Sequence, residues 1–262
     1  MNSPDLSFFT IPLGRQAHDR AREFARQSIS FASEAQKNAV GKRIYLNSLA
    51  VFAVNYYLNW LAYETDWMGG DFADPILRSR WDIADLAIAD LGKLECRPLW
   101  EGETRVALPP EATGDRLGYI IVELCNELNG AHLLGFLPSF DESSTPEFLS
   151  VSDLLSLDDL IDYLFRLEST TEFLQGNDPI AQDVRDRLEG REISEIAAQL
   201  ERIYRQESEE EQPYAIKDLL LRTAIVGTGD RNLNAPVNTD DDWEVLDLAE
   251  SLLEKLRTLW QG

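Results

Sequence analysis

The spacing of apolar residues changes twice along the chain, and this change restricts the possible folds more than any other feature. Apolar residues recur at helical spacing over residues 15–37 and 40–64, which predicts two helices. Between residues 84 and 137 they form short runs separated by turn residues, as strands do. Helical spacing returns after residue 156. We therefore expect an α+β fold, with an N-terminal helical hairpin packed on a small sheet or barrel and an α-helical C-terminal region.

The middle region is expected to form a five-stranded, mostly antiparallel sheet or a small barrel. The near-continuous apolar run from Gly118 to Val122 indicates a central strand. Asn129 and Gly130 are a favoured hairpin-turn pair, which indicates an antiparallel neighbour. The five expected strands are residues 84–88, 93–99, 105–108, 117–124 and 131–137.

The C-terminal region predicts a series of helices. Ser156 followed by Asp158 and Asp159 is typical of a helix start, because a hydroxyl caps the first turn and acids favour its positive end. Trp243 and Trp260 are expected on the apolar face of the last helix. The later helices are expected at residues 179–188, 192–205, 214–226 and 241–259.

Two domains are expected, residues 1–145 and 146–262. The net charge of −23 is spread unevenly: residues 1–80 carry +1, residues 81–150 carry −9 and residues 151–262 carry −15. Both this balance and the apolar pattern change near the polar stretch 139–147. Polar stretches of this kind commonly separate domains, so we place the boundary there.

The negative charge favours one class of partner over others. An acidic surface repels phosphate backbones, so we expect no direct binding of nucleic acid. The same surface speeds encounter with a basic protein, which is therefore the expected partner. The alternative is that the charge serves only solubility.

The sequence favours a cytoplasmic protein without a membrane partner. No apolar run reaches the roughly 18 residues that a membrane-spanning helix needs. The N-terminus lacks the basic start and apolar stretch of a signal peptide. Cys96 and Cys125 are too few for a disulfide framework and are expected to be buried thiols on strands.

No catalytic residue, cofactor or metal is expected, and we predict that the chain is not an enzyme. The only histidines are His18 and His132, and no Gly-rich phosphate loop or nucleophile elbow occurs. Asp240-Asp241-Asp242 lacks the alternating spacing of a calcium loop and indicates a helix N-terminus. The enzymatic alternative is a cysteine nucleophile, Cys96 or Cys125, with His132 beside it in space.

The candidate partner-binding residues are acidic or aromatic and lie in the C-terminal region. The acidic run that ends before Gln212 is either a solvated loop or a docking site for a basic partner. Tryptophans are frequent hot spots when exposed, and exposed ones would also suit a structural subunit of a larger complex. The candidates are Glu207, Glu209, Glu210, Glu211, Asp240, Asp241, Asp242, Trp243 and Trp260.

Several motifs between residues 8 and 165 point to a family. They include Tyr63-Glu-Thr-Asp66, Gly92-Lys-Leu-Glu-Cys-Arg-Pro98 and Leu134-Gly-Phe-Leu-Pro138. With them the chain resembles a cyanobacterial family catalogued as domain of unknown function eighteen twenty-two. The resemblance implies a cyanobacterial, cytoplasmic protein with a non-enzymatic regulatory role. It also implies association with a sigma factor or a caspase-like protein, which suits an anti-sigma or adaptor function.

Overall fold

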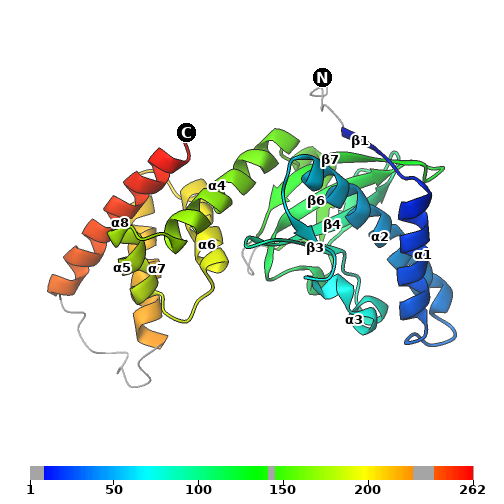
Figure 1. Ribbon diagram of the computed structural model, residues 1–262, viewed down its shortest axis with the longest axis horizontal. Coiled ribbons are helices and arrows are strands. Elements are labelled where there is room, and N and C mark those ends of the chain that lie inside the picture. The colour runs from blue at the N-terminus through cyan, green and yellow to red at the C-terminus, as the bar shows by residue number, and fades with distance from the viewer. Residues whose placement is uncertain (1–8, 141–144, 227–238, 262) are drawn as a thin grey trace. The chain divides into compact units, whose positions relative to one another are not determined.

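The computed structural model describes residues 9–140, 145–226 and 239–261, and Figure 1 shows their helices and strands. The side chains of residues 222–226 and 239–242 are outside this description. The chain divides into two compact units, unit 1 (Met1–Ile161) and unit 2 (Asp162–Gly262). The fold is mixed, with helices in both units and strands in unit 1, so the expected α+β class is confirmed.

Unit 1 contains a six-stranded mixed sheet with the strand order β1-β7-β6-β4-β3-β2. Strands β4 and β6 are paired in parallel, and the other neighbours are antiparallel. A separate two-stranded sheet pairs β5 with β8. The strands of the larger sheet are β1 (Phe9–Pro12), β2 (Thr65–Asp66), β3 (Asp85–Ile88), β4 (Gly92–Trp100), β6 (Arg116–Leu124) and β7 (Gly130–Pro138). Strands β5 (Arg105–Ala107) and β8 (Phe148–Ser150) form the smaller one.

The expected sheet of five mostly antiparallel strands is wrong in its strand count and in its central pairing. Strand β5 pairs with β8 and not with a strand of the main sheet. Residues 101–115 therefore form a crossover connection between β4 and β6, and these two strands run parallel. Strands β1 and β2 were missed because they have 4 and 2 residues, too few to show an alternating pattern.

The described part of unit 1 includes the complete α-helices α1 (Arg15–Ile29), α2 (Lys37–Trp60) and α3 (Pro75–Arg80). Helices α1 and α2 pack on each other, as expected of a hairpin, but α2 also packs on the sheet and is buried on most sides. The hairpin is not a separate N-terminal element, because β1 precedes it and pairs with β7. The short helix α3 was not expected; the Asp74 side chain caps its first turn.

Unit 2 consists of helices around one apolar cluster. Its helices are α4 (Leu157–Gln175), which begins in unit 1, α5 (Pro179–Arg187), α6 (Ile193–Gln206), α7 (Gln212–Val226) and α8 (Thr239–Leu259). The expected positions of these helices are confirmed to within a few residues. Helix α8 contributes four fully buried positions at helical spacing, which fixes the face that it turns to the core. These residues are Val245, Ala249, Leu252 and Leu256.

The boundary between the units lies at residues 161 and 162, inside α4, whereas the sequence placed it between residues 145 and 146. Two contacts explain the difference. Strand β8 pairs with β5. Leu155 and Phe136 also exchange two backbone hydrogen bonds, of 2.9 and 3.1 Å. Both hold the chain up to residue 155 against the first unit.

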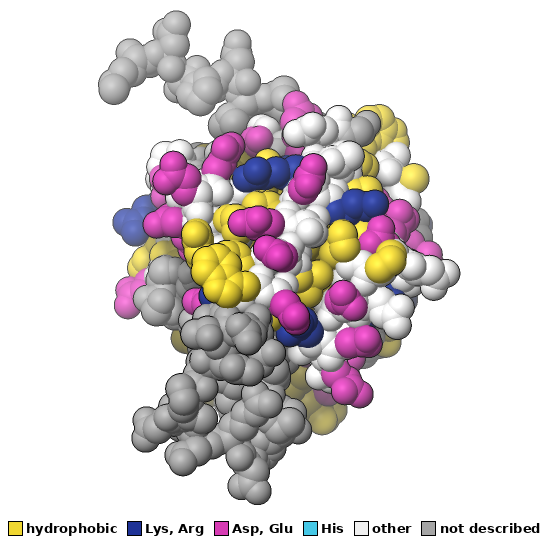
Figure 2. Space-filling view, turned by 90° about the vertical axis from the view of Figure 1, so that its left-hand side faces the viewer, with side chains coloured by type: hydrophobic (Ala, Val, Ile, Leu, Met, Phe, Trp, Pro, Cys, Tyr) yellow, Lys and Arg dark blue, Asp and Glu magenta, His cyan; other side chains and the backbone are white. Residues whose placement is uncertain are grey.

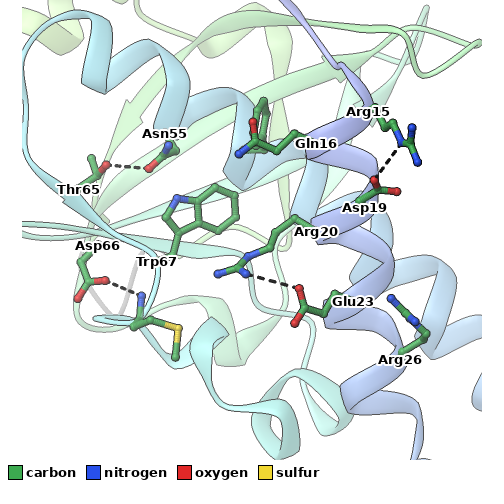
Figure 3. Close-up of a pocket in the computed structure, with 12 residues that line it drawn as sticks. Arg15, Gln16, Asp19, Arg20, Glu23, Arg26, Asn55, Thr65, Asp66 and Trp67 are labelled. Atoms are coloured by element: carbon green, nitrogen blue, oxygen red, sulfur yellow. Dashed lines mark hydrogen bonds and ion pairs between the residues drawn. The ribbon is translucent and has the colours of Figure 1, made fainter.

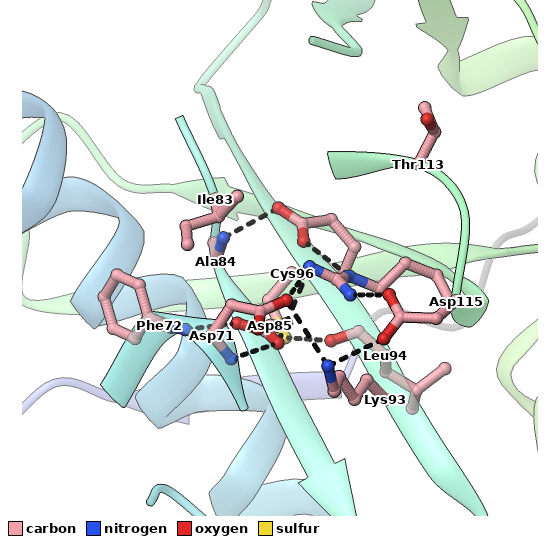
Figure 4. Close-up of polar contacts among 12 residues, drawn as sticks. Asp71, Phe72, Ile83, Ala84, Asp85, Lys93, Leu94, Cys96, Thr113 and Asp115 are labelled. Carbon is pink, nitrogen blue, oxygen red and sulfur yellow. Dashed lines mark hydrogen bonds and ion pairs between the residues drawn. The ribbon is translucent and has the colours of Figure 1, made fainter. Parts of the chain in front are cut away.

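A buried network of charges joins the strands of unit 1 (Figure 4). The Arg116 side chain is 1% exposed and lies 3.3 Å from Glu95 Oε2 and 3.6 Å from Asp85 Oδ2, and both of these carboxylates are wholly buried. Asp85 also accepts backbone hydrogen bonds from Asp71 (2.8 Å) and Phe72 (2.6 Å). Arg116 therefore links β6 to β3, β4 and the turn before α3.

Arg97 forms the second half of this network. It pairs with Asp82 at 3.0 Å and with Glu95 at 3.2 Å. Burial alone would raise the pKa of Asp82, but the charge and hydrogen bonds of Arg97 outweigh burial and hold that pKa below its usual value. For Glu95 burial dominates, so its pKa is raised despite Arg97 and Arg116.

Candidate functional site

The expected acidic run lies in an exposed loop of unit 2. Glu207 caps the C-terminus of α6, and Glu209, Glu210 and Glu211 follow before α7 begins. The Glu211 carboxylate accepts a hydrogen bond from the Ser208 hydroxyl at 2.8 Å. Within the described ranges, the carboxylates of Glu209 and Glu210 have no such partner, so both are available to a ligand.

The buried side chain of Gln212 holds this loop beside α8. Its amide nitrogen donates hydrogen bonds to the carbonyl oxygens of Tyr204 (2.9 Å) and Glu207 (3.2 Å). Its amide oxygen accepts a hydrogen bond of 2.8 Å from the Arg257 guanidinium on α8. One side chain therefore joins the end of α6, the acidic loop and the C-terminal part of α8.

The outward face of α8 is acidic, apart from a tryptophan at its N-terminal end. Four exposed residues recur at spacings of four, three and four, opposite the positions buried in the core. At a rise of 1.5 Å per residue, the stripe is about 16 Å long. We call these residues, Trp243, Asp247, Glu250 and Glu254, together with Glu209 of the loop, the acidic face.

A groove of about 290 Å³ runs between the acidic loop and α8. Glu209, Glu250 and Glu254 line it, and buried Leu253 forms its apolar part. No ion pair neutralises these three carboxylates within the described chain. Arg257 is the one cation among the lining residues, and it is hydrogen-bonded to Gln212. The groove thus offers negative charge around a small apolar surface, which suits the stem and head group of a lysine or arginine.

Unit 2 as a whole is also negatively charged. Residues 162–262 contain 23 Asp and Glu against 11 Lys and Arg, a net charge of −12. In Figure 2, acidic side chains are spread over the face in view, and few basic ones lie among them. A basic partner would therefore meet a favourable field before it contacts the groove.

The two candidate tryptophans have different environments. Trp243 is 69% exposed, more than any other large hydrophobic side chain that the structure describes. Trp260 packs inside unit 2: its indole N–H donates hydrogen bonds to Arg166 O (3.2 Å) and Thr170 Oγ1 (3.1 Å), and its ring lies edge-on to Tyr204. Trp260 therefore stabilises unit 2, while Trp243 is free to contact a partner.

Asp240, Asp241 and Asp242 lie in the first turn of α8, where the sequence placed a helix N-terminus. Their side chains are outside the described ones. The sequence reasoning missed Asp247, Glu250 and Glu254, although their spacing opposite the buried positions of α8 was a usable signal.

Cys125 and His132 lie together beside the turn that connects β6 to β7. Cys125 Sγ is 3.5 Å from His132 Nε2, and the Thr10 hydroxyl is 3.0 Å from His132 Nδ1. This geometry meets the distance requirement of the cysteine-nucleophile alternative. However, burial and the nearby carboxylates of Glu101 and Glu123 raise the pKa of the Cys125 thiol, the opposite of what a reactive thiolate needs.

Cys96 does not join this pair. Its side chain is fully buried on β4, as expected, and burial raises the pKa of its thiol well above the usual value. Cys125, in contrast, is only partly buried and follows the end of β6, so its expected burial on a strand is corrected.

A hollow of about 1130 Å³ lies in unit 1 between α1 and β2 (Figure 3). Arg20 extends from α1 toward Trp67. The charges that line the hollow largely pair with one another, as in Arg20 with Glu23 at 3.5 Å and Arg15 with Asp19 at 3.4 Å. It therefore offers less unpaired charge to a ligand than the acidic face does.

Among the described side chains, no group of three or more His, Cys, Asp and Glu residues is arranged to hold a metal ion. Over the same ranges, no helix combines the length and apolar character needed to cross a membrane.

The chain matches the model of a known protein family over most of its length. The model of a family described as "Protein of unknown function (DUF1822)" matches residues 11–259. The resemblance expected over residues 8–165 is thereby confirmed, and it extends through α8. No curated protein and no solved structure matches the chain.

Proposed function

The chain belongs to this family of unknown function, DUF1822, and we propose that it is a non-enzymatic regulatory protein that binds a basic segment of another protein through the acidic face of unit 2. The observation that carries the proposal is the convergence of three unpaired carboxylates, Glu209, Glu250 and Glu254, on one groove. A lysine or arginine of the partner enters this groove, with its aliphatic stem on Leu253.

The rest of the acidic face extends the contact. Asp247 lies one helical turn from Glu250 and adds a further negative charge along α8. Trp243 supplies a large exposed aromatic surface at the N-terminal end of the stripe, and tryptophan is among the residue types enriched at binding hot spots. A helix with basic and apolar side chains on one face matches this pattern.

The identity of the partner stays a prediction. A sigma factor, which the family resemblance suggests, has suitable chemistry because its DNA-binding face is basic. Binding there would cover the surface that contacts phosphates, which is how an anti-sigma factor acts. An adaptor role with a caspase-like protein requires only that the partner present a similar basic segment.

Removal of the groove's charges tests this proposal. The probe is a fluorescently labelled helical peptide whose polar face carries only lysine and arginine, and its anisotropy reports binding to the full chain. We expect binding that weakens as salt rises from about 0.05 to about 0.3 M. The triple variant Glu209→Gln, Glu250→Gln, Glu254→Gln should bind roughly 3- to 150-fold more weakly, since exposed charge pairs each contribute about 0.2–1 kcal/mol.

The matched control removes the same number of exposed charges elsewhere in unit 2, in the triple variant Asp183→Asn, Asp186→Asn, Glu189→Gln. It should bind the peptide within about twofold of the wild type, because these residues lie outside the groove. An equal loss in both triple variants would show that only net charge matters, and the proposed site would be wrong.

A further inference from the structure

A second groove, in unit 1, has the opposite charge to the acidic face. It lies between α1 and α2, measures about 680 Å³ and is open to solvent. Four cationic side chains line it, two from each helix, and its lining includes no carboxylate. These cations are Arg22, Arg26, Lys37 and Lys42. In a chain with a net charge of −23, such a cluster is a marked local exception.

The floor of this basic groove is apolar and hollowed. Ala25 and Ile29 from α1 face Gly41 from α2. A Cβ atom at position 41 would lie 3.3 Å from Ile29 Cγ2, tighter than an ordinary contact. Glycine therefore lets the helices approach there and leaves the floor open, although it costs a helix about 1 kcal/mol relative to alanine.

Two of the four cations are free to recognise a ligand. Arg22 pairs with Asp19 at 3.0 Å, and Lys37 pairs with Glu34. Arg26 and Lys42 make no ion pair within the described part of the chain; Arg26 Nε donates to a backbone oxygen, and Lys42 lies over the Trp100 ring. Both are exposed and line the groove.

We propose that the basic groove of one copy binds the acidic face of a second copy, with Trp243 on the apolar floor. The two surfaces are complementary: one has an apolar floor and a cationic rim, and the other has an exposed tryptophan followed along α8 by the exposed acids Asp247 and Glu250. Opposite charges steer such surfaces together and fix their register. The inference rests on the proposed function, because it names one basic surface that the acidic face would bind.

This contact gives the protein a way to regulate itself. Each such contact covers the acidic face of one copy, so a basic partner must compete with the groove of the other copy for that face. At that face, association between copies and capture of the partner are mutually exclusive, and the response to the partner depends on protein concentration.

Sedimentation equilibrium of the full chain, over a range of concentrations at low and moderate salt, tests the inference. We expect reversible self-association that weakens as salt rises. The variant Arg26→Glu, Lys42→Glu should raise the dissociation constant about tenfold or more, because two attractive contacts become repulsive. The variant Asp247→Arg, Glu250→Arg should do the same, and a mixture of the two variants should associate again, since the reversed charges are complementary. The control Arg80→Glu, Arg105→Glu changes exposed cations outside the groove and should associate like the wild type.

The labelled basic peptide, added to the same samples, separates this inference from the proposed function. A chain that is monomeric at every concentration but still binds the peptide through the acidic face overturns the inference alone. Association that survives the groove variant, or that the mixture fails to restore, also overturns it. Absence of both association and peptide binding overturns both proposals.

Discussion

Replacement of Arg116 by methionine is expected to lower the free energy of unfolding by about 3–5 kcal/mol at pH 7. Arg116 pairs with both Asp85 and Glu95, which are wholly buried carboxylates. Without it, two charges remain in the core with fewer compensating partners, and the desolvation of a buried charge is costly. Urea unfolding followed by circular dichroism and tryptophan fluorescence measures the change.

The loss should depend on pH in a defined direction. Burial already holds the pKa of Glu95 above its usual value in the wild type, and removal of Arg116 raises that pKa further. A carboxyl group whose pKa is raised in the folded state makes the protein less stable as pH rises. The stability is lost between the unfolded-state pKa of the group, about 4.3, and its folded-state pKa. The difference between Arg116→Met and the wild type should therefore be smaller at pH 5 than at pH 7.

Arg80→Met is the matched control, because Arg80 is exposed and should change stability by less than about 0.5 kcal/mol. Two results would show that the buried charge network does not hold the strands of unit 1 together. One is a loss of unfolding free energy below about 1 kcal/mol in Arg116→Met. The other is a difference in stability from the wild type that does not shrink at pH 5.

Replacement of Arg78 by alanine should have a comparable effect, about 3–5 kcal/mol. The Arg78 side chain is buried and donates hydrogen bonds to Phe72 O (2.6 Å), Ala73 O (3.1 Å) and Ser28 Oγ (3.2 Å). Its guanidinium also lies 4.2 Å from the centre of the Phe24 ring. Burial lowers the pKa of Arg78 to about 10, so the group stays charged at pH 7 and its donors remain available to these acceptors.

Comparison with Arg78→Lys makes this prediction specific. A lysine keeps the charge but cannot present the planar set of donors that reaches α1 and the turn before α3 together. We expect the lysine variant to recover less than half of the stability lost in the alanine variant, as measured by thermal and urea unfolding. Full recovery by lysine would mean that charge alone, and not the geometry of the guanidinium, holds α3 on α1.

The helices were predictable because their cores repeat at helical spacing over many residues. Buried positions Ala17, Ala21, Phe24 and Ser28 in α1 show this pattern directly. The sheet was less predictable because pairing depends on contacts distant in sequence. Nothing local to β4 indicates that its neighbour is the parallel strand β6, and the short strands β1 and β2 have no pattern of their own.

The candidate site was predictable in charge but not in geometry. The acidic loop followed from composition, whereas its position beside Glu250 and Glu254 depends on the hydrogen bonds of Gln212, which join residues far apart in sequence. The two tryptophans could not be distinguished by residue type. Trp243 faces solvent because α8 turns Val245 and Ala249 to the core.

Carbodiimide cross-linking of the full chain to the basic peptide, located by mass spectrometry, tests the central claim most directly. The reagent joins a lysine only to a carboxylate in contact with it, so it reports which acids the peptide touches. We predict cross-links at Glu209, Glu250 and Glu254, with none at the control carboxylates Asp183 and Asp186. Cross-links spread evenly over the exposed carboxylates of unit 2 would contradict the proposed binding site.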